Sequence, residues 1–249
     1  MELIAHRGCM AEVPQNTLNS FEAAIKQGAK MIELDVVSCK TGEIIIFHDD
    51  DVETITRGQA RGAIDSFTFE ELRQFNVHDG FNDGNFYQIP TLQELFELVK
   101  NLSLELGYKI RLNIELKGPG TAMPVSIIIE EYMRTKEFIP DDIIVSSFRH
   151  DELKNFKLLL PKIEIAVLID DDQWEIMGRN CQHAIELTKS LGATALNPSI
   201  DFVSAEMVLT CHQAGLTVNV WTIKTQEEYD RMKALEVDAV FVNTQKLEK

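Results

Sequence analysis

Apolar residues follow two alternating patterns along this chain. Short runs rich in Ile, Val and Leu predict β-strands, and longer stretches with apolar residues every three or four positions predict amphipathic helices. The expected strands span residues 3–5, 31–37, 44–47, 110–116, 143–145, 163–169, 193–196, 217–221 and 239–242. The expected helices span residues 17–27, 92–106, 124–136, 151–159, 181–191, 205–214 and 226–234.

This alternation over 249 residues predicts an α/β fold, specifically a (β/α)8 TIM barrel. The chain has one more expected strand than the eight that a (β/α)8 barrel contains. The segments 31–37 and 44–47 are separated only by "SCKTGE", which is typical of a hairpin turn rather than of a crossover helix. We therefore expect a barrel that is irregular near its start. A doubly wound open sheet is the rival fold, but no GxGxxG follows the first strand.

The segment 49–90 interrupts the alternation. It is polar, it contains Gly58, Gly62, Gly80 and Gly84, and only "TFEELRQF" within it resembles a helix. We expect one catalytic domain over residues 1–249, in which residues 49–90 form a small, loosely packed cap over the C-terminal mouth of the barrel. The same insertion could also supply a homodimer interface.

Composition and charge restrict the classes of partner and substrate that this chain can bind. Hydrophobic residues make up 45% of the chain, and 24 Lys and Arg against 40 Asp and Glu give a net charge of −16. Such a chain repels nucleic acids and anionic membranes, so we expect neither nucleic-acid binding nor stable membrane association. An anionic small-molecule substrate would need local positive charge. The four scattered cysteines form no CxxC, and no secretory signal is visible, so we expect a reducing, cytoplasmic compartment.

Two of the expected strands carry carboxylates on one face. Side chains alternate along a strand, so Glu33 and Asp35 of "MIELDVV" share a face. Asn113, Glu115 and Lys117 of "IRLNIELKG" likewise share a face. Because the outer face of a barrel strand packs on helices and is apolar, these polar faces should point into the barrel.

Histidines stand where two other strands end. His6 and Arg7 follow the first strand, and His48 follows residues 44–47. The C-terminal ends of barrel strands build the active sites of (β/α)8 enzymes. Three inward carboxylates either raise their pKa values or bind a cation, and all-oxygen ligands suit Mg²⁺ or Ca²⁺. A buried ion-pair network is the structural alternative.

An ordered set of short motifs then resembles one known family. "AHRG", "PQNT", "ELD", "FHD", "IPTLQE", "NIELK", "VSSF", "LNPS" and "VWTI" follow one another over nearly the whole chain. In this order they resemble the glycerophosphodiester phosphodiesterase family. That resemblance implies a metal-dependent (β/α)8 hydrolase that splits glycerophosphodiesters into glycerol 3-phosphate and an alcohol.

The resemblance also assigns roles to residues. It implies catalytic histidines His6 and His48, metal ligands Glu33, Asp35 and Glu115, and phosphate-binding residues Arg7 and Lys117. One histidine would act as base and the other as acid, and the sequence does not decide which. The nucleophile would be either the glycerol 2-hydroxyl or water.

Other positions carry weaker indications. Gln15 stands where the family often has Glu, and Asn243 stands where it commonly has Asp. Trp221 is interpreted either as barrel core or as an aromatic wall of the pocket, and Phe148 after "VSS" is interpreted in the same way. The stretch "IDDDQWE" is interpreted either as part of the lining of the mouth or as a solvated acidic loop, and the solvated loop is favoured.

Two rival functions remain at this stage. A phospholipase D-like enzyme on the same scaffold would act on lysophospholipids or sphingomyelin, and it would need an exposed apolar rim to meet a lipid surface. The aromatic residues of the 49–90 insertion could form such a rim. A catalytically silent binding protein is the third hypothesis, and the intact set of histidines and carboxylates argues against it.

Overall fold

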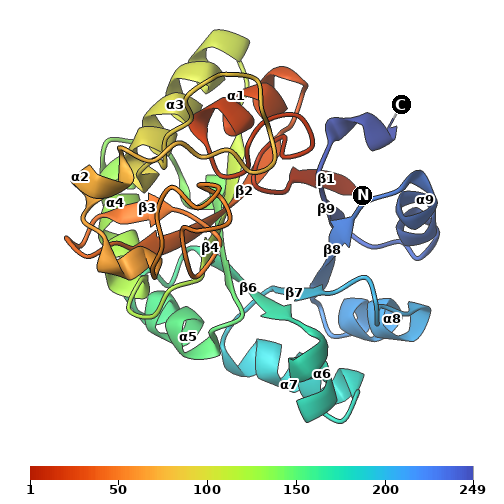
Figure 1. Ribbon diagram of the computed structural model, residues 1–249. Coiled ribbons are helices and arrows are strands. Elements are labelled where there is room, and N and C mark those ends of the chain that lie inside the picture. The colour runs from red at the N-terminus through yellow and green to blue at the C-terminus, as the bar shows by residue number, and fades with distance from the viewer. Residues whose placement is uncertain (249) are drawn as a thin grey trace.

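The computed structural model describes residues 1–248 and contains a closed ring of parallel strands with helices outside it (Figure 1). The strands pair in the order β1-β9-β8-β7-β6-β5-β4-β2, and β1 also pairs with β2, which closes the ring. The ring strands are β1 (Glu2–Ala5), β2 (Met31–Ser38), β4 (Arg111–Leu116), β5 (Ile143–Ser147), β6 (Glu164–Ile169), β7 (Ala195–Pro198), β8 (Thr217–Ile223) and β9 (Ala239–Val242). The predicted TIM barrel is confirmed.

The ninth strand lies outside this ring. β3 (Ile44–Ile46) pairs antiparallel with β2, with Val36 opposite Ile46 and Ser38 opposite Ile44. The turn between them is closed by a hydrogen bond from Cys39 N to Glu43 O of 3.1 Å. The extra strand candidate is therefore a hairpin partner of β2, and the predicted irregularity at the start of the barrel is confirmed.

Seven helices match the predicted ones within two residues at each end. They are α1 (Leu18–Lys26), α3 (Leu92–Leu106), α4 (Ala122–Arg134), α5 (His150–Leu159), α7 (Cys181–Ser190), α8 (Ala205–Gln213) and α9 (Gln226–Ala234). The hydroxyls of Thr17 and Ser204 cap α1 and α8 by accepting backbone hydrogen bonds. No helix in the described part of the chain is both long enough and apolar enough to cross a membrane.

One helix was missed by the sequence analysis. α6 (Asp171–Ile176) directly follows β6, in the stretch interpreted as a loop, so the loop interpretation is wrong, although Asp171 and Asp172 are exposed. Asp170 caps the helix by accepting a hydrogen bond from Gln173 N, and Gln173 completes a capping box. The helix is too short for an apolar repeat to reveal it, and the capping pattern was the usable signal.

The barrel has an apolar floor beneath its polar mouth. Inside the ring, Ile4, Met31 and Phe241 belong to a small buried apolar cluster. The large core lies between the strands and the helices, where it includes outward-facing residues such as Leu34 and Ile114. Inward positions nearer the strand C-termini are consequently free to carry polar side chains.

The segment between β3 and α3 packs on the neighbouring ends of β2 and β3. It contains the short helices η1 (Ile64–Ser66) and α2 (Phe69–Leu72), and it lies beside β2, β3 and β4 in Figure 1. Ile55 and Leu72 are buried in one apolar cluster with Val37 and Phe47. The expectation of loose packing is wrong, because isolated apolar residues from distant positions converge into this cluster.

We predict that Gly8 is indispensable to the turn after β1. Its φ is +87°, and a Cβ there would lie 2.7 Å from the backbone carbon of Ser20. Gly8→Ala should therefore lower the free energy of unfolding by about 2 kcal/mol more than Gly215→Ala. Gly215 is the matched control, because its φ is +77° and a Cβ there would meet nothing within 4 Å. Equal losses in urea denaturation would contradict this prediction.

Candidate active site

Three buried carboxylates meet at the ends of β2 and β4. The parallel register pairs Glu33 with Asn113 and Asp35 with Glu115, which places their side chains side by side on the inner face. One carboxylate oxygen from each of Glu33, Asp35 and Glu115 lies within 4.8 Å of the others. All three residues are at most 8% exposed.

Burial and mutual repulsion shift the pKa values of these carboxyl groups. Burial, together with repulsion from Asp35, raises the pKa of Glu115 to about 8 and holds the pKa of Glu33 well above its ordinary value. Burial also acts to raise the pKa of Asp35, but the charges of Arg7, His48 and Lys117 outweigh it, and the pKa falls below its usual range. The cluster thus favours a net charge less negative than three carboxylates would carry.

The same cluster fits a divalent cation. Its donors are carboxylate oxygens, the ligands that Mg²⁺ and Ca²⁺ prefer. The three oxygens converge closely enough to share one ion, and an added positive charge would relieve the repulsion that raises the pKa values of Glu33 and Glu115.

Two cationic side chains flank the carboxylates. The Arg7 backbone N–H donates a 3.0 Å hydrogen bond to Glu33, and Arg7 Nε lies 3.3 Å from Asp35 Oδ2. Lys117 Nζ lies 3.8 Å from Glu115 Oε1 and 4.0 Å from Asp35 Oδ1. Arg7 adopts a left-handed φ of 53°, a conformation that is costly for a non-glycine residue and that recurs at functional sites.

Two histidines reach the same place with different partners. His6 Nδ1 lies 2.9 Å from the amide oxygen of Asn243, and His48 Nδ1 lies 2.7 Å from Asp49 Oδ1. Burial, and then the nearby positive charge of Arg7, lowers the pKa of His6 to about 3, so its neutral form prevails at neutral pH.

These groups line a cavity of about 300 Å³ at the barrel mouth. Of the residues singled out from the sequence, it is lined by His6, Arg7, Glu33, His48, Glu115, Lys117, Phe148 and Trp221. Asp35 is 1% exposed and belongs to the carboxylate cluster without lining the cavity. Ser146, to which the sequence analysis gave no role, also lines it, and so does Asp170 of "IDDDQWE", for which a place at the mouth was one of two interpretations. Both occur at strand C-termini, and that position was the available signal.

Asp79 of the 49–90 insertion is connected to the site by hydrogen bonds through Gln15. Gln15 Oε1 accepts a 2.6 Å hydrogen bond from the Arg7 guanidinium. The backbone N–H and the side-chain amide of Gln15 donate to the carboxylate of Asp79, at 3.2 and 3.1 Å. Asp79 belongs to the 49–90 insertion, so the insertion helps to hold Arg7 in place.

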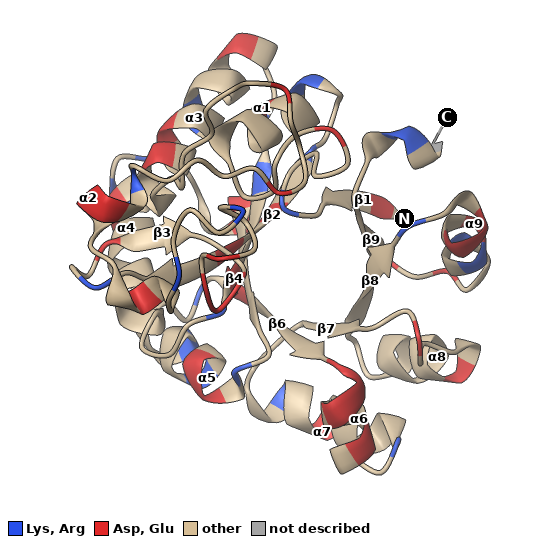
Figure 2. Ribbon diagram, in the orientation of Figure 1, with Lys and Arg blue, Asp and Glu red and all other residues tan. Residues whose placement is uncertain are grey.

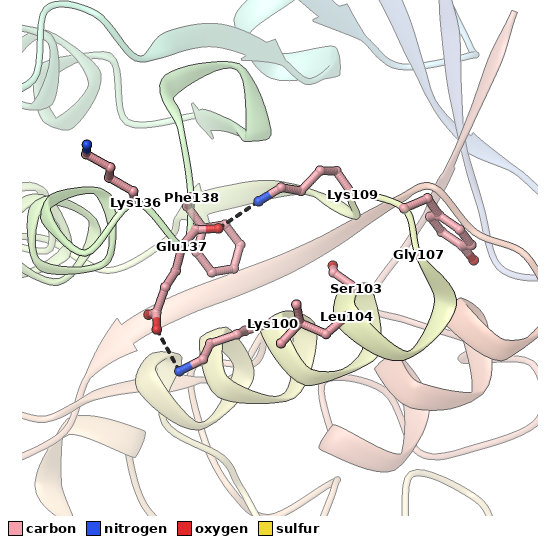
Figure 3. A pocket seen from close by; sticks show the side chains of 9 residues that line it. Lys100, Ser103, Leu104, Gly107, Lys109, Lys136, Glu137 and Phe138 are labelled. Carbon is pink, nitrogen blue, oxygen red and sulfur yellow. Dashed lines mark hydrogen bonds and ion pairs between the residues drawn. The ribbon is translucent and has the colours of Figure 1, made fainter.

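A larger cavity of about 510 Å³ lies elsewhere, beside α3 and the end of α4 (Figure 3). Two of its three lysines already have partners: Lys100 Nζ lies 2.8 Å from the carboxylate of Glu137, and Lys109 donates to the Glu137 carbonyl at 2.8 Å. Its lining contains no histidine and no group of carboxylates. The chemistry is therefore assigned to the barrel mouth.

Charge is distributed unevenly over the molecule. Asp and Glu are spread over outer helices such as α3, α6 and α9 (Figure 2). Two cations, Arg7 and Lys117, nevertheless line the mouth cavity. A chain with a net charge of −16 thus offers an anionic group a local positive site there.

Comparisons with known proteins agree with this geometry. The model of the glycerophosphoryl diester phosphodiesterase family matches residues 6–246. A glycerophosphodiester phosphodiesterase from Caldanaerobacter subterraneus is 30% identical over 97% of this chain and 93% of its own length. One from Bacillus altitudinis is 31% identical, over 97% and 94%.

A solved structure is also similar. It is an Oleispira antarctica phosphodiesterase in complex with its product sn-glycerol-3-phosphate, 27% identical to this chain with a TM-score of 0.84. The match covers 100% of this chain and 95% of the other. The family model, the relatives and the barrel together show that this chain belongs to the glycerophosphoryl diester phosphodiesterase family, whose members are phosphoric diester hydrolases.

Proposed function

We propose that this protein hydrolyses glycerophosphodiesters to glycerol 3-phosphate and an alcohol at the barrel mouth, with the help of a divalent cation. The observation that carries the proposal is one cavity in which two histidines and two cationic side chains line the walls beside a three-carboxylate cluster. Membership of the family supports the reaction. The product bound to the Oleispira antarctica relative supports the substrate class.

The carboxylates and cations would divide the work of binding. Glu33, Asp35 and Glu115 would hold Mg²⁺ or Ca²⁺, which when bound neutralises developing charge on the phosphate oxygens. Arg7 can contact two phosphate oxygens at once, and Lys117 adds a point charge. Together they hold the diester and stabilise its extra negative charge in the transition state.

The histidines would move the protons. One accepts the proton of the nucleophile, either the glycerol 2-hydroxyl or water, as its oxygen bonds to phosphorus. The other gives a proton to the departing alkoxide as the phosphorus–oxygen bond breaks. With water as nucleophile this yields glycerol 3-phosphate directly; with the 2-hydroxyl it yields a cyclic phosphate, which water then opens to glycerol 3-phosphate with the roles of the two histidines reversed. Each ring is held through Nδ1, by Asn243 for His6 and by Asp49 for His48, so that each Nε2 remains available for transfer.

The 49–90 insertion would act as a cap on the side of Arg7, whose position it supports. It begins directly after His48, and its Asp79 supports Gln15 and hence Arg7. Its aromatic residues argue against a lipid-binding rim, since Phe67, Phe69 and Phe75 pack on the inner cluster. Phe86, which is 57% exposed, is the one exposed aromatic residue of this segment and does not by itself form a rim.

The deciding experiment measures glycerol 3-phosphate release from a panel of glycerophosphodiesters. Release should occur, stop after EDTA treatment and return on adding Mg²⁺ or Ca²⁺. Turnover of lysophospholipid or sphingomyelin in place of these diesters would favour the phospholipase D-like alternative. Activity that survives exhaustive chelation would exclude the role of the cation.

We predict that the chelator-treated protein loses stability as pH rises. The folded-state pKa of Glu115 is raised by burial and by Asp35 from 4.5 to about 8. The contribution of Glu115 to the free energy of unfolding is therefore fully present below pH 4.5 and is lost as the pH rises through about 8. The loss should be on the order of a few kcal/mol. Calorimetry from pH 5 to 8 should show the fall in wild type and a flatter curve in Glu115→Gln. Identical curves would contradict the prediction, and Glu164→Gln, an exposed site, is the control.

We predict that His6→Ala and His48→Ala each lose about 10²-fold to 10⁴-fold in kcat, while the exposed His183→Ala retains activity. The leaving group of a glycerophosphodiester of p-nitrophenol needs no proton, so the variant that lacks the acid should turn this substrate over at nearly the wild-type rate. The other variant should stay slow. Near-wild-type activity in both folded variants would overturn the acid–base proposal.

We predict that Asp79→Ala lowers kcat/KM about fivefold to thirtyfold, because it removes both hydrogen bonds that hold Gln15. The effect should fall mainly on KM, since Arg7 binds phosphate. Asp83→Ala is the control, because the hydrogen bonds of Asp83 go to Asn85 and Tyr87 of the same segment. Equal behaviour of the two variants would mean that the cap does not act through Gln15.

A further inference from the structure

The barrel mouth has two chemically different sides. Arg7 follows β1, and Lys117 follows β4. In the order of the ring, β6 lies opposite β1, and β8 lies opposite β4. Asp170 after β6 therefore lies across the ring from Arg7, and Trp221 in β8 lies across it from Lys117. Together with Phe148 after β5, the neighbour of β4, they form one wall of the cavity. Figure 1 shows β6 across the ring from β1, and β8 across it from β4.

The two aromatic rings of this wall are fixed in place. Phe148 and Trp221 contact edge to face, with their ring centroids 5.4 Å apart and their planes at 90°. The Trp221 indole N–H donates a 2.9 Å hydrogen bond to the carbonyl of Asn197. The Phe148 carbonyl accepts one of 2.9 Å from the side chain of Gln173. The rings are thus ordered before any ligand arrives.

Asp170 supplies negative charge beside these rings. One of its oxygens caps α6 by accepting from Gln173 N at 2.8 Å. Among residues 1–248, no Lys, Arg or His forms an ion pair with this carboxylate, although it lines the cavity. Asp171 and Asp172 follow it in the first turn of α6, and Figure 2 shows this acidic start of the helix.

We propose that this wall binds an ammonium group, so that the enzyme prefers glycerophosphodiesters whose leaving alcohol is positively charged. The inference rests on the proposed function. A cation gains from the faces of aromatic rings and from an unpaired carboxylate, whereas a neutral alcohol gains from neither. The anionic phosphate of such a substrate would meet Arg7 and Lys117, and its cationic head group would meet Asp170.

The test compares two substrates of the same shape. One is the glycerophosphodiester of choline, and the other is that of 3,3-dimethylbutanol, in which carbon replaces the quaternary nitrogen. Wild type should prefer the choline diester about tenfold in kcat/KM. Asp170→Asn should reduce that preference to about twofold or less, through a larger loss on the choline diester than on the neutral one. Asn still caps a helix, so α6 should persist.

Two further variants define the result. Asp171→Asn, on the exposed first turn of α6, should keep the wild-type preference. Phe148→Leu should weaken it by removing one aromatic face. Equal rates on both diesters in wild type would overturn this inference alone. An equal loss on both in Asp170→Asn would also overturn it, because Asp170 would then contact the glycerol common to both substrates. Failure to release glycerol 3-phosphate from either diester would overturn the proposed function itself.

Discussion

The active site depends on the enforced proximity of three buried carboxylates. Parallel pairing of β2 with β4 sets Asp35 beside Glu115, and alternation along β2 brings Glu33 to the same face. Buried like charges are costly unless protons or cations compensate them. Arg7 and Lys117 supply part of that compensation. The remaining demand for positive charge makes the site suited to a metal ion, and the cations gathered there can in turn attract an anionic phosphate.

The outline of this site could be predicted from sequence because it rests on local rules. A period of two along strands identifies the inward faces of β2 and β4, and the (β/α) alternation identifies the end of the barrel at which His6 and Lys117 must lie. Cap residues such as Thr17 mark helix ends. Each rule needs only a few neighbouring residues, so tertiary packing has little chance to override it.

The supporting contacts could not be predicted, because they join residues far apart in sequence. Asn243 and His6 are 237 positions apart, and Asp79 and Gln15 are 64 apart. No spacing rule relates such pairs. Closing the ring brings the ends of β9 and β1 together, and packing of the insertion on β2 and β3 brings Asp79 over the first loop. The insertion looks polar locally and forms a core only when its scattered apolar residues meet.

Acidic residues differ in their surroundings between the outer helices and the cavity. Acidic residues over the outer helices are solvated, and exposed charges contribute little to stability. Asp170 has the same residue type, but a strand end places it in a partly enclosed cavity where its charge is less screened. Strand order places it across the ring from Arg7. Residue type alone therefore does not distinguish a solvated acidic residue from one that lines the cavity, whereas its position at the end of a barrel strand does.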